Sequence, residues 1–509
     1  MVTSPVPRGP KRPSVISPMV LADPQTAPPG EAKALVTDND DRRMVLIELL
    51  VGAGVDPDDV RDQFLHMFHR VLRNEPPAPT PVGRHYVRCM LTPDEIQRLV
   101  RGGAKSSSAK SAQQALQLIR RVWPDLVVEA HLDRSLTTIK ADAAIRTYGS
   151  GGTGVVWAVL DSGIDAEHPH FAANGTLTAD AVRPLHKDFT LCPDASKNPL
   201  VDVYGHGTHV AGIIAGESPT DPKLVRIAST QPTAEGLPEW VPRMLAQGSR
   251  LSGVAPHANL VSLKVLDDDG KTLSSVLIDA LNYVREINSY GNDLQIHGVN
   301  LSLGCGWMPR DYAAGQSPLC RELDLLTGAG VVCVVSAGNL GAGTAAAGVG
   351  AAILGTTADV YGQLSTITDP GNAATAITVG SVHRYRPHTS GVTFDSSKGP
   401  TLDGRRKPDL VAPGERITSA ATGLMAKGID LLKDDGTEGA ANYIEDSGTS
   451  MAAAHVSGAI AAFLSARTEF VGKPQEVKEI FLKSAVDLGR HEFFQGAGLV
   501  DLMRALSNT

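Results

Sequence analysis

The sequence predicts an α/β fold in which a doubly wound parallel sheet forms the larger, C-terminal part of the chain. Between residues 154 and 414, short apolar segments alternate with longer segments of helical periodicity. The apolar segments are GVVWAVLD, NLVSLKVL, GVNLSLG, GVVCVVSAGN, AITVGSV and DLVAPG. This alternation is typical of a parallel sheet covered by helices on both faces, in which the carboxyl ends of the strands border one crevice. We therefore expect functional side chains directly after these strands.

Four regions are expected along the 509-residue chain. Residues 1–37 are rich in proline and predict a disordered arm. Residues 38–80 contain two stretches of helical periodicity before a proline-rich linker, which predicts a helical hairpin. Residues 81–135 show the pattern strand, helix, helix, strand, which predicts a small α+β module. Residues 136–509 form the predicted parallel-sheet domain.

Three motifs place a carboxylate, an imidazole and a hydroxyl at positions where elements begin or end. Asp161 ends the apolar segment GVVWAVLD, and His206 lies in YGHGTHVAG, the glycine-flanked opening of a helix. Ser450 lies in DSGTSMAAAH, where small residues leave room for a substrate backbone. A serine hydroxyl is a poor nucleophile unless a base removes its proton and a third group orients that base. The motifs therefore predict Ser450 as nucleophile, His206 as base and Asp161 as the orienting carboxylate.

The motifs DSGID, GHGTHVAG and SGTSMA, in the order Asp161, His206, Ser450, resemble those of the subtilisin-like serine proteases, the subtilase family (peptidase S8). In VVCVVSAGN, Asn339 falls where this family keeps the side-chain amide of its oxyanion hole. The resemblance covers residues 139–506. It implies a serine endopeptidase that hydrolyses a protein or peptide substrate through an acyl-enzyme intermediate, without a required cofactor.

The resemblance also implies a substrate groove in which the substrate backbone is added as a strand between two segments of the domain. These segments are Gly270-Lys271-Thr272-Leu273 and Ser302-Leu303-Gly304. The floor of the first side-chain pocket is then Ser336-Ala337-Gly338, and Leu340 follows Asn339 without a charge. We expect an uncharged residue on the acyl side of the cleaved bond. The run Asp267-Asp268-Asp269 is either an acidic rim of this groove or a polar turn, and the turn is favoured.

Composition restricts the partners and the compartment. A net charge of −8 argues against a general affinity for nucleic acid or an anionic membrane. The N-terminus has no apolar core of the length of a secretory signal, and the five cysteines are odd in number without metal-ligand spacing. We therefore expect a cytoplasmic protein with free thiols, although Cys305 and Cys320 could pair if the protein were exported. The insertion at residues 217–250 occupies the position of the family's calcium loop but lacks acidic ligand spacing, so we expect no strong calcium site.

The 81–135 module resembles the family's propeptide by position and pattern, and an unrelated α/β module is the alternative. Residues 125–132 are expected to be its last strand, which leaves only residues 133–137 before the catalytic domain. Five residues reach at most ~18 Å, so we expect the module to stay attached and self-cleavage to be slow or absent. Two further functions stay open: a dedicated maturation protease that recruits a regulatory partner through residues 38–73, and a non-enzymatic binding protein on a protease fold.

Overall fold

The structure is a computed structural model in which the chain divides into two compact units, residues 1–127 and 128–509. Each unit has its own hydrophobic core. The structure describes residues 15–16, 18–21, 42–51, 55–73, 76–101, 118–124, 127–130, 137–193, 195–221, 224–232, 238–243, 250–306, 311–344, 360–432 and 438–508.

The first unit is an antiparallel sheet with helices packed on it. Its strands are β1 (Arg43–Leu49), β2 (Thr80–Val82), β3 (Tyr86–Leu91) and β4 (Ile119–Pro124), in the order β2-β3-β1-β4. Its helices are α1 (Pro18–Leu21), α3 (Pro57–Leu72) and α4 (Pro93–Val100). Phe64 and Phe68 of α3 are buried in the same core as Val45 and Ile47 of β1. A small α+β module is therefore present, as the sequence predicts.

The predicted helical hairpin at residues 38–80 is wrong, because Arg43–Leu49 is a strand at the centre of this sheet. A short apolar run such as RMVLIEL has no periodicity that separates a buried strand from a buried helix. Only its partner stretch, Pro57–Leu72, is helical. The recruitment element proposed for residues 38–73 thus loses its structural basis.

The predicted ends of the module also differ from the structure. Its last strand is β4, in the stretch that the predicted pattern gives to its second helix, and Val127–Ala130, the described part of the predicted last strand, is not part of its sheet. Val20 is fully buried in the core of the unit, so the part of the N-terminal arm that is described packs on the module. The rest of the predicted arm lies outside the described residues.

The second unit is built on seven parallel strands, which confirms the predicted fold class. They are β6 (Val156–Asp161), β7 (Lys187–Asp188), β10 (Asn259–Lys264), β12 (Gly298–Leu301), β14 (Val332–Ser336), β17 (Ile377–His383) and β18 (Leu410–Glu415). Their order is β18-β17-β14-β12-β6-β10-β7, and each neighbouring pair is parallel. The strand order reverses between β6 and β12, which is the place where doubly wound folds bind ligands.

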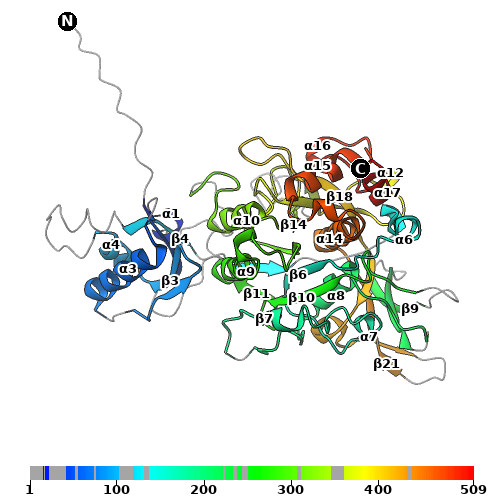
Figure 1. Cartoon of the computed structure of the whole chain (residues 1–509), viewed down its shortest axis with the longest axis horizontal. Coiled ribbons are helices and arrows are strands. Elements are labelled where there is room, and N and C mark those ends of the chain that lie inside the picture. The colour runs from blue at the N-terminus through cyan, green and yellow to red at the C-terminus, as the bar shows by residue number, and fades with distance from the viewer. Residues whose placement is uncertain are drawn as a thin grey trace, which may run out of the picture. The chain divides into compact units, whose positions relative to one another are not determined.

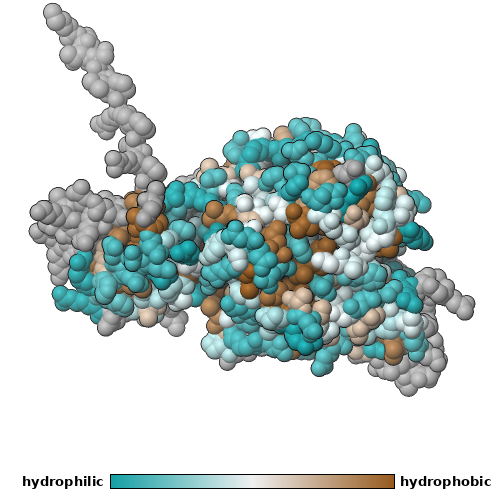
Figure 2. Space-filling model, viewed as in Figure 1, coloured by the Kyte–Doolittle hydropathy of each residue, from teal (hydrophilic) through white to brown (hydrophobic). Residues whose placement is uncertain are grey.

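Helices cover both faces of this sheet (Figure 1). On one side lie α8 (His206–Ile214) and α14 (Thr449–Ala466), and on the other α9 (Ser274–Ile287) and α10 (Pro318–Gly328). α14 packs against α8 and against β12, β14, β17 and β18. It is the one helix of the described residues that is long and apolar enough to cross a membrane, and it is 89% buried in the unit. On the face shown in Figure 2, hydrophobic residues gather between α10 and α14 and hydrophilic residues cover the periphery.

The insertion at residues 217–250 contributes two strands to a second sheet. These strands, β8 (Ile227–Pro232) and β9 (Pro238–Arg243), extend the pair β19 (Ile417–Ala420) and β22 (Tyr443–Asp446) in the order β19-β22-β8-β9. Among the described residues, no group of three or more His, Cys, Asp or Glu side chains is arranged to hold a metal ion. All five cysteines are free thiols, and only Cys192 is exposed.

The remaining elements of the second unit connect or flank these layers. The short strand pairs are β15 (Ala342–Thr344) with β16 (Val360–Gly362), and β20 (Asp430–Leu432) with β21 (Glu438–Ala440). The helices are α6 (Ala141–Tyr148), α7 (Pro169–Ala172), α12 (Pro387–Ser390), α13 (Gly423–Ala426), α15 (Pro474–Ser484), α16 (Glu492–Gln495) and α17 (Leu502–Ser507). The 3-10 turns are η1 (Thr137–Ile139), η2 (Arg183–Leu185), η4 (Ser289–Gly291) and η5 (Thr468–Phe470).

Candidate active site

Asp161 and His206 form a buried pair at the topological switch point. Asp161 is the last residue of β6, and His206 is the first residue of α8. The His206 Nδ1 atom lies 2.7 Å from Asp161 Oδ1, and the two side chains are 0% and 1% exposed. A carboxylate oxygen accepts, so Nδ1 carries the proton and donates it to Asp161. The other ring nitrogen, Nε2, is then the one that can accept a proton.

The start of α8 is fixed by a carboxylate cap and two glycines. Asp202 accepts from the backbone N–H of Gly205 at 2.7 Å and from that of Thr208 at 2.8 Å, which satisfies donors of the first turn. Gly205 has φ +102°, and a Cβ on it would lie 2.4 Å from the Thr422 carbonyl oxygen. A Cβ on Gly207 would lie 2.1 Å from the Gly163 carbonyl oxygen. The glycines of the GHG motif therefore let His206 approach the loop after β6.

Ser450 lies in the first turn of α14 and is joined to β12 by reciprocal hydrogen bonds. Its Oγ donates to the Ser302 carbonyl at 3.1 Å, and the Ser302 hydroxyl donates to the Ser450 carbonyl at 2.8 Å. The Asn300 amide donates to the Ser302 hydroxyl, and Ser457 donates to the Asn300 carbonyl oxygen, each at 2.9 Å. This buried chain of polar groups holds α14 against the sheet.

Asn339 follows β14 and is oriented by Thr449, the residue before Ser450. Asn339 Oδ1 accepts from the Thr449 backbone N–H and from the Thr449 hydroxyl, each at 3.0 Å. A backbone N–H can only donate, so the atom facing Thr449 is the amide oxygen and not its nitrogen. The Asn339 NH2 is thus left for a different acceptor, and the Ser450 N–H lies in the first helical turn, where it has no intrahelical partner.

A model of the subtilase family matches residues 152–499, which is more than half of the chain. The chain belongs to this family. It is 29% identical to serine protease AprX of Bacillus subtilis (strain 168), over 75% of this chain and 73% of that protein. It is 28% identical to subtilisin E of the same organism, over 73% of this chain and 70% of the relative. Pyrolysin of Pyrococcus furiosus is 30% identical over 60% of this chain and 21% of its own length.

The two segments predicted to line the subtilase groove flank a strand of the chain itself. β5 (Val127–Ala130) lies between β11 (Lys271–Leu273) and β13 (Leu303–Gly304) in a three-stranded sheet. It is antiparallel to β13, with Ala130 opposite Leu303 and Glu129 opposite Gly304. Both of these β5 residues belong to the second unit. The expectation that the connecting chain is too short to enter the groove is therefore wrong, because β5, the described part of the strand predicted at residues 125–132, does not belong to the first unit's sheet.

The predicted pocket floor, Ser336-Ala337-Gly338, lies where β14 ends, and all three residues are buried. The Ser336 hydroxyl donates to the Leu303 carbonyl at 3.5 Å, and the Gly338 N–H donates to the Thr449 hydroxyl at 3.1 Å. A Cβ on Gly338 would lie 2.6 Å from the Thr368 hydroxyl. The structure thus joins the predicted floor to both β13 and α14.

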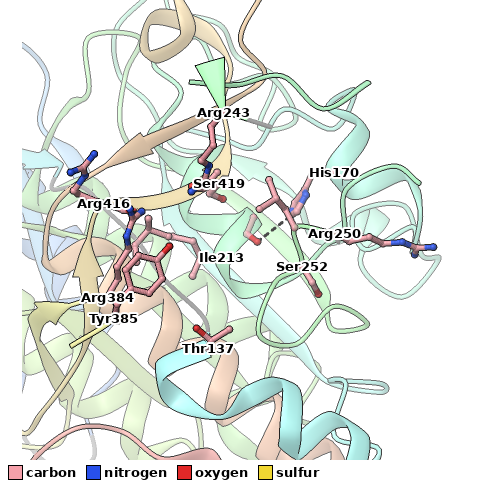
Figure 3. A pocket seen from close by; sticks show the side chains of 14 residues that line it. Thr137, His170, Ile213, Arg243, Arg250, Ser252, Arg384, Tyr385, Arg416 and Ser419 are labelled. Carbon is pink, nitrogen blue, oxygen red and sulfur yellow. Dashed lines mark hydrogen bonds between the residues drawn. The ribbon is translucent and has the colours of Figure 1, made fainter. Parts of the chain in front are cut away.

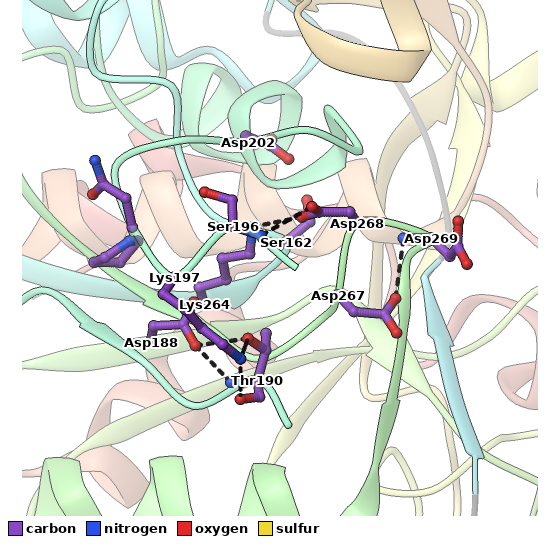
Figure 4. A network of polar contacts seen from close by, with 12 residues as sticks. Ser162, Asp188, Thr190, Ser196, Lys197, Asp202, Lys264, Asp267, Asp268 and Asp269 are labelled. Carbon is purple, nitrogen blue, oxygen red and sulfur yellow. Dashed lines mark hydrogen bonds and ion pairs between the residues drawn. The ribbon is translucent and has the colours of Figure 1, made fainter. Parts of the chain in front are cut away.

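The acidic run after β10 forms a turn held by its own carboxylates (Figure 4). Asp267 Oδ1 accepts from the backbone N–H of Asp269 at 3.1 Å and of Lys271 at 2.9 Å. Asp268 lies 3.0 Å from the fully buried ammonium of Lys264, and the pKa of Asp268 is lowered by hydrogen bonds from Ser196 and Lys264 against the effect of burial. The favoured interpretation, a polar turn, is confirmed for Asp267. Gly270, next in the chain, has φ +75° and packs against the Tyr204 ring.

The motifs single out the principal side chains of the site but do not show which neighbouring residues orient them. Ser162 donates from its backbone to Asp161 at 2.8 Å, and its hydroxyl accepts from Gly207 at 2.9 Å. In the same way, Thr449 donates a hydrogen bond to Asn339, and Asn300 donates one to Ser302. Ser162 and Thr449 lie inside the motifs DSGID and SGTSMA, but small polar residues in turns are too common for the sequence alone to assign them a partner. Asn300 lies inside an apolar strand, where a buried amide indicates a hydrogen-bonded role.

Proposed function

We propose that this subtilase is a serine endopeptidase with Ser450 as nucleophile, His206 as base, Asp161 as orienting carboxylate and Asn339 as oxyanion-hole donor. The observation that carries the proposal is the buried His206–Asp161 hydrogen bond of 2.7 Å. This bond selects the tautomer in which Nε2 can accept the proton of Ser450, and it stabilises the imidazolium that results.

Catalysis then begins with a rotation of the Ser450 hydroxyl. Its Oγ donates to the Ser302 carbonyl in the present conformation. Turning toward His206 Nε2 lets the ring take the proton as Oγ attacks the substrate carbonyl, and the ring later gives this proton to the leaving amine. The Asn339 NH2 and the Ser450 N–H would bind the oxygen that becomes negatively charged. A backbone carbonyl freed at Ser302 can then accept from the N–H of the substrate strand.

Labelling with a fluorophosphonate probe tests the assignment, because an activated serine displaces fluoride from such a probe and becomes phosphonylated. We expect the full-length protein to carry the probe on Ser450, and the Ser450→Ala protein to show neither labelling nor peptidase activity while keeping its circular dichroism spectrum. Peptidase activity in pure Ser450→Ala protein would refute the assignment.

We also propose that β5 is a tethered substrate strand that occupies the groove until it is cut. The supporting observation is its position between β11 and β13, with Ala130 opposite Leu303. The antiparallel register directs the chain after Ala130 toward Ser302, whose carbonyl holds Ser450. A strand in this place blocks other substrates by occupying the same backbone hydrogen-bonding groups.

We propose a reducing compartment such as the cytoplasm for the working protein. Cys89, Cys305, Cys320 and Cys333 are buried thiols, and burial raises the pKa of Cys333 to about 12. Thiols of this kind resist oxidation in place, because the thiolate is the reactive form. Thiol counting by alkylation of denatured protein from its native host tests the proposal, and a disulfide between Cys305 and Cys320 would contradict it.

A further inference from the structure

A pocket separate from the four proposed catalytic residues is lined by arginines of the second unit (Figure 3). We call it the arginine pocket, and it has a volume of about 230 Å³. Its wall includes Arg243 of β9, Arg384 and Tyr385 after β17, Arg416 before β19, and Ser419. Pockets for drug-sized ligands have roughly 300–1,000 Å³, so this one suits a smaller molecule.

Three of these arginines converge on one buried carboxylate. Glu445, 3% exposed, lies 2.7 Å from Arg384, 3.2 Å from Arg416 and 3.6 Å from Arg243. Among the described residues, Glu445 is the one carboxylate within ion-pair distance of Arg243 and Arg416, and its single negative charge is shared with Arg384. The two charges that it does not offset are held close together in a partly buried place, where like charges repel strongly.

The arginines of the pocket differ in their hydrogen bonds and ion pairs with neighbouring residues. The pKa of Arg243 is lowered by burial and by the charge of Arg416, against an opposing contribution from Tyr385. The Arg416 Nε is buried and has no hydrogen-bond partner among the described residues. Arg250 also lines the pocket, but its guanidinium points away from the other three in Figure 3 and pairs with Glu217 at 3.2 Å.

The backbone at the pocket is held in an unusual conformation. Arg416 has φ +57°, the left-handed region that side chains other than glycine rarely adopt. Its N–H donates to the Ser447 hydroxyl at 3.3 Å, and its side chain bonds the Thr230 carbonyl. Contacts from two segments thus keep the Arg416 side chain beside Glu445. Strain that the surrounding structure maintains is a feature of functional sites.

We propose that the arginine pocket binds a small phosphate-class anion. A phosphate or phosphomonoester dianion would match the two positive charges that Glu445 leaves, and its oxygens suit the planar fork of guanidinium donors. The hydroxyl of Tyr385 on the same wall supplies a further donor, whereas the Ser419 hydroxyl already donates to the His209 carbonyl at 2.7 Å. The ligand is either free inorganic phosphate or the phosphate group of a small metabolite, because both present the same chemistry. This site is independent of the proposed peptidase activity.

Calorimetric titration of full-length Ser450→Ala protein at constant ionic strength tests the proposal, with inorganic phosphate, glycerol phosphate and chloride as ligands. We expect saturable binding of at least one phosphate compound and none of chloride. Tighter binding of glycerol phosphate would identify an organic phosphate as the ligand, and tighter binding of inorganic phosphate would identify the free ion. Absence of saturable binding for both would refute the proposal.

Two variants of the Ser450→Ala protein, Arg243→Gln and Arg416→Gln, distinguish phosphate binding in the arginine pocket from general electrostatic attraction to the protein. Each should weaken phosphate binding by about tenfold or more, because each removes a charged fork from the pocket. The matched control is Arg250→Gln, which removes the same charge from an arginine paired with Glu217 and should change the affinity by less than about threefold. Equal weakening in the control would show nonspecific attraction and overturn the site. A phosphate-dependent rise in the unfolding temperature gives a second readout in each variant that folds.

Discussion

At the scale of single residues, the site depends on groups that hold other groups in one orientation. Asn339 is the plainest case, because Thr449 fixes its amide oxygen and thereby the direction of its NH2. The amide is proposed to act when the oxyanion forms, so its removal should affect the transition state more than substrate binding.

Asn339→Ala is therefore expected to lower kcat by about 10² to 10³ with little change in KM, the range measured for the corresponding amide of a subtilisin. Steady-state kinetics on a peptide substrate provide the measurement. The probe-labelled fraction of Ser450 serves as control for active-site content. A change confined to KM would mean that Asn339 binds the substrate rather than the transition state.

Substitution of Thr449 tests whether this orientation matters. Thr449→Val removes the hydroxyl that bonds Asn339 Oδ1 and Gly338 N–H but leaves the backbone bond to Asn339. We expect kcat to fall by about tenfold, the effect of losing roughly 1.4 kcal/mol of hydrogen bonding. Thr449→Ser retains the hydroxyl and should stay within about threefold of the parent. Equal kcat values for the Val and Ser variants would exclude a positioning role.

The sequence identifies residues of this kind unevenly. Asp161 and His206 lie 45 positions apart, and the structure brings them together because β6 ends beside the start of α8. That pairing is predictable, since each residue sits in a motif with its own glycines. The arginine pocket offered no such signal, because Arg243, Arg384 and Arg416 lie on separate segments and meet only through Glu445.

At the scale of elements, the alternation of strands and helices in the second unit was predictable and the boundary between the units was not. Strand runs such as VVCVVS are apolar throughout because both faces of a parallel sheet are covered. In contrast, β1 and the stretch around β4 have apolar residues that suit either a helix or a strand. β1 is a strand because it pairs with β3, and this pairing cannot be predicted from the local sequence pattern.

The placement of β5 leads to an expectation opposite to the one drawn from the sequence. With β4 as the last strand of the first unit, residues 125–136 form the connection, which is long enough to enter the groove and to return. We expect purified wild-type protein to cut itself between Ala130 and Asp133, and intact-mass measurement would detect the new N-terminus. Ser450→Ala protein should stay whole. An intact wild-type chain that is active on peptides would refute the tethered-substrate role.

The route of this cleavage can be distinguished by dilution. Because β5 is held in the groove by its own chain, the rate constant should not depend on protein concentration. A rate that rises in proportion to concentration would indicate cleavage of one molecule by another.

At the scale of the whole molecule, the core of the second unit encloses histidines that the proposed mechanism does not use. His455 lies in α14, and its Nδ1 donates to the Met451 carbonyl at 2.7 Å, so this histidine has a structural role. Burial lowers the pKa of His170 to about 3 and that of His455 to about 3. Burial also lowers the pKa of His168, His186 and His297. The rings of His170 and His455 are therefore neutral in the folded protein across the range in which exposed histidine takes up a proton.

This burial predicts that mild acid destabilises the fold. Below a pH of about 6.5 the unfolded chain binds protons that the folded chain does not, so the free energy of unfolding falls as pH falls toward about 3. A histidine shifted to about 3 contributes at most roughly 1.4 kcal/mol per pH unit within this window and nothing above it. Guanidinium denaturation of Ser450→Ala protein above and below a pH of about 6.5 measures how steeply the free energy of unfolding depends on pH. His455→Gln in the Ser450→Ala protein should reduce this pH dependence by the contribution of one proton, which is at most roughly 1.4 kcal/mol per pH unit. A stability that does not fall on acidification, or an unchanged slope in the variant, would contradict the placement of these neutral histidines in the core.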